Sequence, residues 1–373
     1  MKALINFLKS ETVFCVSFFL ALASALIVRP DSFYLAYPDY RTLALLFCLM
    51  LIVAGFRSLG VFDFMGRSLL KRAGSLRRLS VTMVLLCFWS SMVITNDVTL
   101  ITFVPFTILV FRMVGEEERI LKVVVLETIA ANLGSMATPI GNPQNLYLYS
   151  VSGITWMEFG RAVWPYAAVS LVMLLAVLAF GKDEPLSGEV MEEQKEGGEG
   201  KLWISLLPFL ALFVLCLLVV FRVLSYVPVL IVVAAAIFLV NRQLFGKVDY
   251  FLLLTFLCFF VFIGNAKRIP EISGFLASLV GGRELLSGIL TSQVISNVPA
   301  AILLSGFTDN FSVLLTAVNL GGLGTLIASL ASLISFKFFA REYPGQKGKF
   351  LKVFTLWNLL FLAVLTVMAC FLT

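Results

Sequence analysis

Two polar stretches supply residues that can bind a small ion. The stretch "SSMVITND" lies in the middle of an apolar run and contains Ser91, Thr95, Asn96 and Asp97. It is followed by "NLGSMATPIGNPQN" at residues 132–145. Where such a segment interrupts a helix, freed backbone carbonyls can ligate Na⁺ and the N-termini of the half-helices can hold an anion. These residue types therefore predict an ion-binding pocket at a helix break.

Both stretches recur in the second half of the chain. The pattern of Ser, three residues, Ser or Thr, then Asn begins at Ser91 and again at Ser292, 201 positions later (292 − 91). The second stretch returns as "NLGGLGTLIASLAS", which begins at Asn319, 187 positions after Asn132 (319 − 132). One alternative is that the Gly residues only permit close helix packing. Two breaks that each follow a polar segment favour two inverted repeats that build one site.

The composition indicates a protein that is surrounded by a lipid bilayer. The chain has 373 residues, of which 60% are hydrophobic, and its apolar runs near 20 residues indicate transmembrane helices. It contains no His, which excludes His-based zinc sites, Ser-His-Asp triads and His proton relays. Its six Cys lie in apolar runs without metal-ligand spacing, and its net charge of +6 is spread over short loops, which argues against a nucleic-acid partner. We expect no cofactor beyond a coupling ion such as Na⁺.

The order of the segments predicts an all-α polytopic membrane protein with about nine transmembrane helices, two re-entrant hairpins and two discontinuous helices. The first inverted repeat covers residues 1–180 and the second 202–373, with an acidic flexible linker at 181–201. The expected spans are 12–28, 40–56, 157–180, 202–221, 227–240, 248–264 and 350–372, the broken helices 118–150 and 311–339, and the hairpins 80–113 and 284–306.

Three shorter segments complete this organisation. Residues 57–78 alternate apolar and basic side chains and predict an interfacial amphipathic helix, with residues 268–282 as its counterpart. The run after Lys9 is interpreted as a helix, and a cleaved signal peptide ending near "ALASA" is the alternative.

With the N-terminus inside and the C-terminus outside, most of the 28 Lys and Arg fall in cytoplasmic segments. We expect an inner (plasma) membrane protein of a bacterium.

The two broken segments resemble those of the ion transporter superfamily. "GSMATPIGNPQN" is similar to its motif Gly-Gly-x-Ala-Thr-x-Ile-Gly-Thr-Pro-Pro-Asn, "ISNVPA" to its second hairpin tip, and "ITNDVTL" to the first tip of its arsenite-permease and antiporter branch. Ser135, Asn142 and Gln144 depart from the first motif, and the second broken helix lacks its Pro-Pro-Asn ending. The resemblance covers both halves and implies a scaffold part, a transport part, a homodimer and elevator motion.

The resemblance also implies ligands. For substrate binding they are Thr95, Asn96, Asp97, Thr138, Asn142, Ser296, Asn297, Val298, Pro299 and Thr325. For two Na⁺ sites they are Ser91, Thr95, Asn96 and Gly134 in the first half, and Ser292, Ile295, Asn297 and Gly321 in the second.

Two carboxylates bear on the coupling ion. A carboxylate at Asp97, near the bilayer centre, is costly unless it is paired, protonated or metal-bound. It would repel a carboxylate substrate and suits Na⁺ or H⁺ coupling, whereas the structural alternative is a helix N-cap. Glu127 lies before the first break and is either a second titrating group or a packing partner. Lys267, Arg268 and Arg283 are interpreted as anchors at the membrane interface.

These observations favour a secondary active transporter over other classes. One version carries a small anion or oxyacid, such as citrate, a dicarboxylate or arsenite, with Na⁺ or H⁺, and the other is a Na⁺/H⁺ antiporter that uses Asp97. An intramembrane enzyme is a remote alternative, because the tips lack clustered Glu and Arg and the chain has no GxSxG motif. A passive channel is disfavoured because symmetric hairpins close a pathway rather than line a pore.

Overall fold

The computed structural model describes residues 11–62, 64, 74–180 and 199–372, and the described residues form helices and no strands. The helices before residue 181 are α2 (Thr12–Ile27), α3 (Tyr40–Ser58), α5 (Leu76–Ile94), α6 (Asn96–Met113), α7 (Glu117–Ser135), α8 (Pro143–Ser152) and α9 (Trp156–Ala179). Those after residue 198 are α10 (Glu199–Val220), α11 (Tyr226–Asn241), α12 (Tyr250–Lys267), α13 (Pro270–Val280), α14 (Glu284–Ile295), α15 (Asn297–Ser305), α16 (Phe311–Leu320), α17 (Leu330–Glu342) and α18 (Lys347–Leu372). Short 3₁₀ turns lie at Ser32–Ala36, Arg242–Lys247 and Pro344–Gln346.

The helices confirm an all-α polytopic membrane protein. Among the described residues, 7 helical segments are long and apolar enough to cross a bilayer. Large apolar side chains on them face outward, including Leu239 at 84% exposure and Val172 at 66%. Such surfaces are unfavourable in water and suit lipid. The basic part of the expected amphipathic helix and most of the linker lie outside the described residues, whereas α13 occupies the expected counterpart at 268–282.

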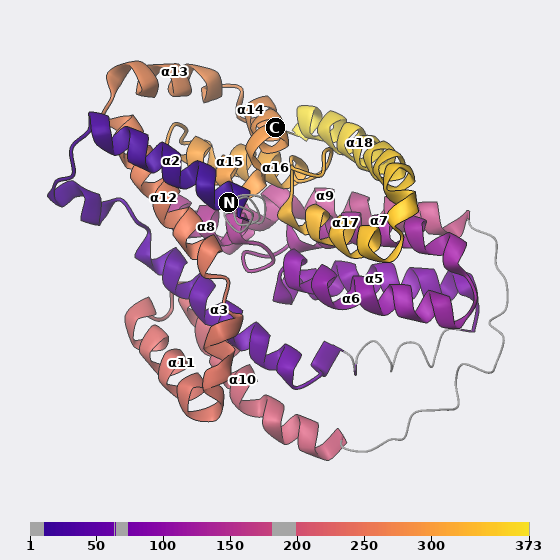
Figure 1. Cartoon of the computed structure of the whole chain (residues 1–373). Coiled ribbons are helices and arrows are strands. Elements are labelled where there is room, and N and C mark those ends of the chain that lie inside the picture. Colours follow the sequence, from indigo (N-terminus) through magenta and orange to yellow (C-terminus); the bar gives the residue numbers. More distant parts are fainter. Residues whose placement is uncertain (1–10, 63, 65–73, 181–198, 373) are drawn as a thin grey trace, which may run out of the picture.

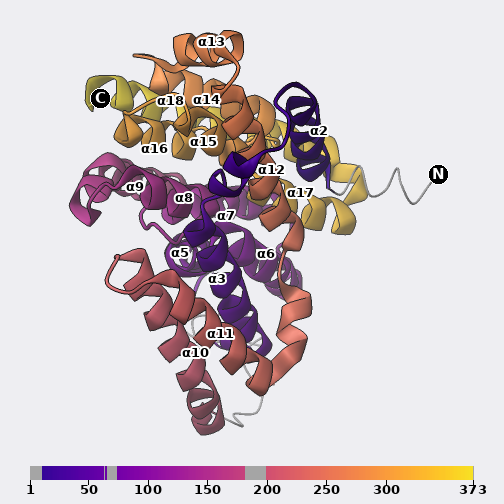
Figure 2. The same cartoon turned by 90° about the vertical axis from the view of Figure 1, so that its left-hand side faces the viewer.

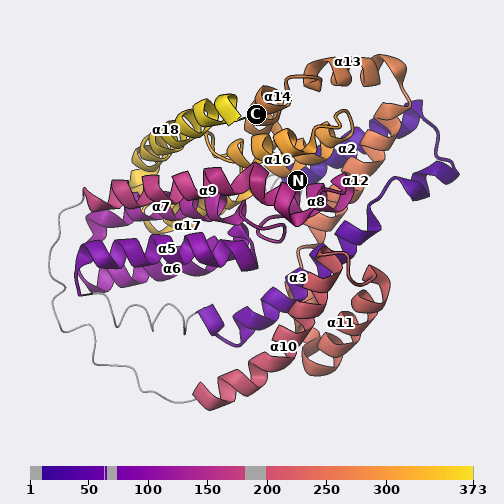
Figure 3. The ribbon, with the colours of Figure 1, turned by 180° about the vertical axis from the view of Figure 1, so that it is seen from behind.

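The helices are divided here into two groups by their contacts. Figures 1 and 2 show α10 and α11 at one end of the molecule and α13 and α14 at the other. We call α2, α3 and α10–α13 the frame helices: α2 packs along α12, and α3 packs against α10 and α11. We call α5–α9 and α14–α18 the hairpin helices: α5 and α6 pack on α7, α14 packs on α16, and α17 contacts both α6 and α7. Figure 3 shows α9 running alongside α7, with α5 and α6 beside them.

The two groups meet where α3 contacts α8, α12 contacts α15 and α13 contacts α14. The contact between α8 and α12 is aromatic, because the Tyr147 ring lies 6.2 Å from the Phe256 ring and 5.5 Å from the Phe260 ring. Between the groups lies a cavity of about 510 Å³, bounded by α5 on one side and α3 and α10 on the other. Its lining is mostly apolar and includes Trp89, Val93 and Leu210.

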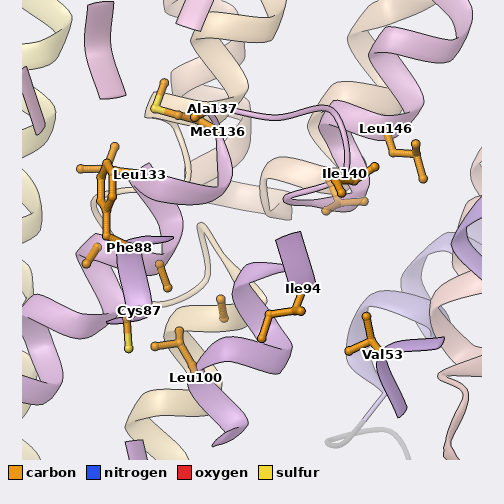
Figure 4. Packing of buried hydrophobic residues seen from close by; sticks show 14 of the residues in the cluster. Val53, Cys87, Phe88, Ile94, Leu100, Leu133, Met136, Ala137, Ile140 and Leu146 are labelled. Carbon is orange, nitrogen blue, oxygen red and sulfur yellow. The ribbon is translucent and has the colours of Figure 1, made fainter. Parts of the chain in front are cut away.

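Eight of the hairpin helices end or begin at the four interruptions that the sequence predicts. Thr95 alone joins α5 to α6, and Ser296 alone joins α14 to α15. Residues 136–142 separate α7 from α8, and residues 321–329 separate α16 from α17. Asn142 caps α8 through a hydrogen bond from Asn145 N, with Pro at the first helical position, as these residue types favour. Figure 4 shows Leu133, Met136, Ala137 and Ile140 around the first interruption.

Candidate functional site

Each hairpin tip is held to the broken helix of its own half by the backbone. Thr95 has φ 71° and ψ 151°, and Ser296 has φ 75° and ψ 154°. In this conformation the N–H of the next residue bonds to the loop at the helix break. Asn96 N donates to Gly141 O at 3.1 Å, and Asn297 N donates to Ala328 O at 2.9 Å. The donors are 201 positions apart (297 − 96) and the acceptors 187 (328 − 141), which are the offsets of the sequence motifs.

Two further contacts follow the same offsets. Thr138 Oγ1 donates to Met92 O, and Thr325 Oγ1 donates to Gln293 O at 3.4 Å. A Cβ added at Gly134 would lie 2.7 Å from Ser91 Oγ, and one added at Gly321 would lie 2.6 Å from Ser292 Oγ. The glycines therefore let each hairpin approach the break closely, which a larger residue would prevent.

Two asparagines cross-link the halves. Asn132 Oδ1 accepts from Asn96 Nδ2 at 3.0 Å in its own half and from Ser329 Oγ at 3.0 Å in the other half. Asn319 Oδ1 accepts from Asn142 Nδ2 at 3.1 Å, which is the reciprocal link. Asn132 and Asn319 are 187 positions apart, and so are Asn142 and Ser329, so the two links form a matched crossed pair.

The network continues through buried side chains. Asn132 Nδ2 donates to Ser332 Oγ at 3.2 Å, and Asn319 Nδ2 donates to Asn145 Oδ1 at 2.7 Å. These side chains are 4% exposed or less. A buried polar network whose members are all hydrogen-bonded fixes one arrangement of the helices that carry it. The residues around the breaks therefore act as one rigid unit.

The residues predicted for the first half divide into two sets. Ser91, Thr95, Asn96, Thr138 and Gly134 all lie where the hairpin meets the break, as the contacts above show. Asn142 lies beside them, but it is 1% exposed and its amide is bonded to Ser135 Oγ at 3.1 Å and to Asn319. Its polar atoms therefore serve the network.

In the second half, Ser292, Ser296, Asn297 and Gly321 lie where the hairpin meets the break, and Ile295 is the last residue of α14. Val298 and Pro299 are buried in the first turn of α15. Thr325 is exposed in the second loop. Sequence reasoning did not assign roles to Asn132, Asn145, Gln293, Asn319, Ser329 or Ser332. The repeated Asn at 132 and 319 was a usable signal for two of them.

The carboxylates occupy different environments. Asp97 lies in the first turn of α6, half-buried, and Asn96 Oδ1 accepts from its backbone N–H. The N-cap position belongs to Thr95, so Asp97 is favoured by the helix dipole rather than as a cap. Glu127 is fully buried in α7 and accepts from Thr107 Oγ1 of α6, while its second carboxyl oxygen has no partner among the described residues. Hydrogen bonds among the described residues therefore satisfy only one of the two carboxyl oxygens of Glu127.

Four helix N-termini converge on the cluster. α6 begins at Asn96 and α15 at Asn297, both directly at a tip. α8 and α17 begin after Asn142 and Ser329, the residues that make the crossed links. The N-terminus of a helix carries a partial positive charge and free N–H groups, which favour anions. The arrangement can thus hold an anion although none of the tip residues is basic.

Comparison with known proteins shows which transporters this chain is similar to. A model of the citrate transporter family matches residues 9–313. An uncharacterized transporter of Methanocaldococcus jannaschii is 35% identical over 300 residues, which are 80% of this chain and 81% of that protein. The inner membrane protein YbiR of Escherichia coli is 34% identical over 303 residues, 80% of each chain. A silicon efflux transporter of Oryza sativa is 30% identical over 183 residues, 46% of this chain and 37% of its own length.

Proposed function

The chain belongs to the citrate transporter family and is therefore an integral membrane transporter and not an enzyme, and we propose that it carries a small anion or oxyacid together with Na⁺ or H⁺. Citrate, a dicarboxylate and arsenite are the substrates that fit the sequence motifs. The name of the rice relative adds silicon to the range of cargo to be tested.

The observation that carries this proposal is the pair of polar tips, each docked on a broken helix by the same contacts. Helix breaks that face each other near the middle of a membrane are the sites of secondary transporters. Four helix N-termini provide the positive potential for an anion, and a cation bound beside Ser91, Asn96 and Gly134 would supply the remaining counter-charge. The anion and the coupling ion would then bind within one rigid unit.

The matched contacts also support two inverted repeats and an elevator movement. The hairpin helices are cross-linked by buried hydrogen bonds, whereas the frame helices meet them through α3–α8, α12–α15 and α13–α14 contacts and a largely apolar cavity. This boundary is largely apolar, although Arg222, after α10, donates to Tyr149 O and Gly153 O at its edge, both at 2.8 Å. A rigid unit beside such a boundary suits movement of the hairpin helices against the frame. A homodimer built on the frame, in the plasma membrane of a bacterium with the N-terminus inside, completes this proposal.

Na⁺/H⁺ antiport is the second candidate, and Asp97 is the observation that favours it. This carboxylate has no cationic partner within the described part of the chain, although it lies in an apolar helix that is long enough to cross a membrane. A carboxylate in that setting is retained for ion or proton binding more often than for stability.

The test compares the apparent melting temperature of the purified protein in Na⁺ and in choline, at two pH values, with citrate, succinate, sulfate, arsenite or silicic acid. A ligand that binds the folded state raises this temperature by mass action. Stabilisation by one anion that requires Na⁺ supports cation-coupled anion transport. Stabilisation by Na⁺ alone that is lost at low pH and in Asp97→Asn supports antiport. Asp309→Asn, which changes an exposed carboxylate in the loop before α16, is the control, and a protein that responds to no anion and no cation contradicts both.

A further inference from the structure

The carbonyl groups freed by the second break are already occupied by a side chain. Gln293 lies on α14, one residue after Ser292, and faces the second loop. Its Nε2 donates to Gly321 O and to Leu323 O, both at 2.8 Å. Its Oε1 accepts from Thr325 N at 2.9 Å. The Gln293 carboxamide therefore satisfies two carbonyl groups and one N–H group of the loop that forms the second break.

The first half is built differently at the matching position. Met92 stands 201 positions before Gln293 (293 − 92) and has no amide to offer. There Gly134 O accepts from two backbone N–H groups, those of Met136 and, at 3.0 Å, of Ala137, and from no side chain among the described residues. Asn145 does supply a carboxamide, but it comes from α8, behind the loop, and donates to Met136 O at 3.1 Å and Thr138 O at 3.0 Å. The residue that matches Asn145 in the second half is Ser332 (145 + 187).

This difference decides where a cation fits. Two carbonyl oxygens 2.8 Å from one nitrogen are arranged as they would be around a small cation, and the amide N–H groups point at the lone pairs that the cation would use. The space is filled, because a Cβ added at Gly324 would lie 2.3 Å from Gln293 Oε1. A cation could enter only by displacing the amide and leaving Thr325 N unpaired. In the first half, the resemblance assigns Ser91, Asn96 and Gly134 to a cation, and Met92 has no amide that could compete for their oxygens.

We propose that the Gln293 carboxamide permanently takes the place of a cation in the second half, so that each chain binds one coupling cation, in the first half, instead of a symmetric pair. This inference rests on the proposed cation-coupled transport. Gln293 would thereby set the stoichiometry of coupling. The cation in the first half would bring one positive charge with each anion, and the Gln293 amide would contribute hydrogen bonds but no charge.

Binding of radioactive sodium to the purified full-length protein, counted per chain at saturation, tests this inference. The wild type should bind one ion. Ser91→Ala should weaken binding by about tenfold or more, as loss of a group around a metal site does, whereas Ser292→Ala should leave it unchanged. Met92→Gln, which gives the first half the amide of the second, should abolish binding. Met and Gln have similar shapes and volumes, so this exchange disturbs packing little.

The reciprocal variant, Gln293→Met, should raise the count to two ions, because it frees the carbonyls of Gly321 and Leu323. If this variant does not fold, the two Ser→Ala variants and Met92→Gln still decide the question. Two ions per wild-type chain would overturn the inference and leave the proposed function intact. One ion that is lost in Ser292→Ala but kept in Ser91→Ala would also overturn it. No bound sodium at all would remove sodium coupling itself, together with the inference.

Discussion

Replacing Asn132 by Ala should destabilise the protein several times more than replacing Ser329 by Ala, although the two side chains share one hydrogen bond. Ser329→Ala removes that bond, and Asn132 Oδ1 keeps its bond from Asn96. Asn132→Ala removes three bonds, to Asn96, Ser329 and Ser332. Side-chain hydrogen bonds between membrane helices average about 0.6 kcal/mol and reach about 1.7 kcal/mol. The expected costs are therefore about 0.6 kcal/mol for Ser329→Ala and about 2–5 kcal/mol for Asn132→Ala.

A double-mutant cycle measured by SDS-induced unfolding in mixed micelles checks this reasoning. Once Asn132 is gone, Ser329→Ala should cost almost nothing more, since its partner has already been removed. Ser335→Ala is the matched control: Ser335 is equally buried in α17, but its hydroxyl bonds only to Ala331 O of the same helix. Equal costs for the two single variants, or strictly additive costs in the double variant, would refute the assignment of Asn132 as the link between the halves.

Three other predictions concern packing, charge and movement. Gly134→Ala should lower the melting temperature strongly, because the added Cβ would lie 2.1 Å from the backbone carbonyl oxygen of Phe88. Gly274→Ala on α13 is the control: its Cβ meets open space, and the change should be neutral or stabilising by up to about 1 kcal/mol. Arg268 donates to Asp31 at 2.7 Å and holds the pKa of the Asp31 carboxyl below its usual range. The small stabilisation from this exposed pair is therefore present at neutral pH and lost as the pH falls below about 4. Thermal melting of wild type and Asp31→Asn should consequently converge in acid and in high salt, and a gap that persists there would contradict the pairing. Leu210→Trp should narrow the cavity of about 510 Å³ and slow uptake into proteoliposomes without changing the stabilisation by substrate. An unchanged uptake rate would argue against movement across this boundary.

The interruptions of the helices were predictable because their signals are local. Gly, Pro and Asn break a helix wherever they cluster, so the sequence alone predicts breaks within 118–150 and 311–339, and the structure has them at residues 136–142 and 321–329. The polar tips of the hairpins were predictable for the same reason. That a single residue, Thr95 or Ser296, makes each turn was not, because its backbone conformation depends on contacts with the loop that follows.

The pairing of the amides could not be read from the sequence. Asn132 and Ser329 are 197 positions apart, and Asn142 and Asn319 are 177 apart, so only the packed helices bring them together. Asn142 illustrates the difficulty: its place in the motif suggests contact with substrate, whereas its amide is buried and bonded on both sides. The assignment of ligands to the substrate and to the coupling ion stays a prediction for the same reason, since amides and hydroxyls serve networks and ligands equally well.

The backbone strain at the two tips provides an independent argument that the tips are functional. The conformation shared by Thr95 and Ser296 is one that essentially only Gly adopts freely, and it costs other residues about 1–3 kcal/mol. With Gly at either position the chain would make the same turn without that cost. The N–H of the Asn that follows would still donate the same hydrogen bond. The hydroxyls do little for the fold: Ser296 Oγ reaches its partners only at 3.4–3.5 Å, and Thr95 Oγ1 bonds to no residue in the described part of the chain. Strain retained for two hydroxyl groups that the protein interior scarcely uses supports a ligand outside the protein as their partner, at the same position in both halves.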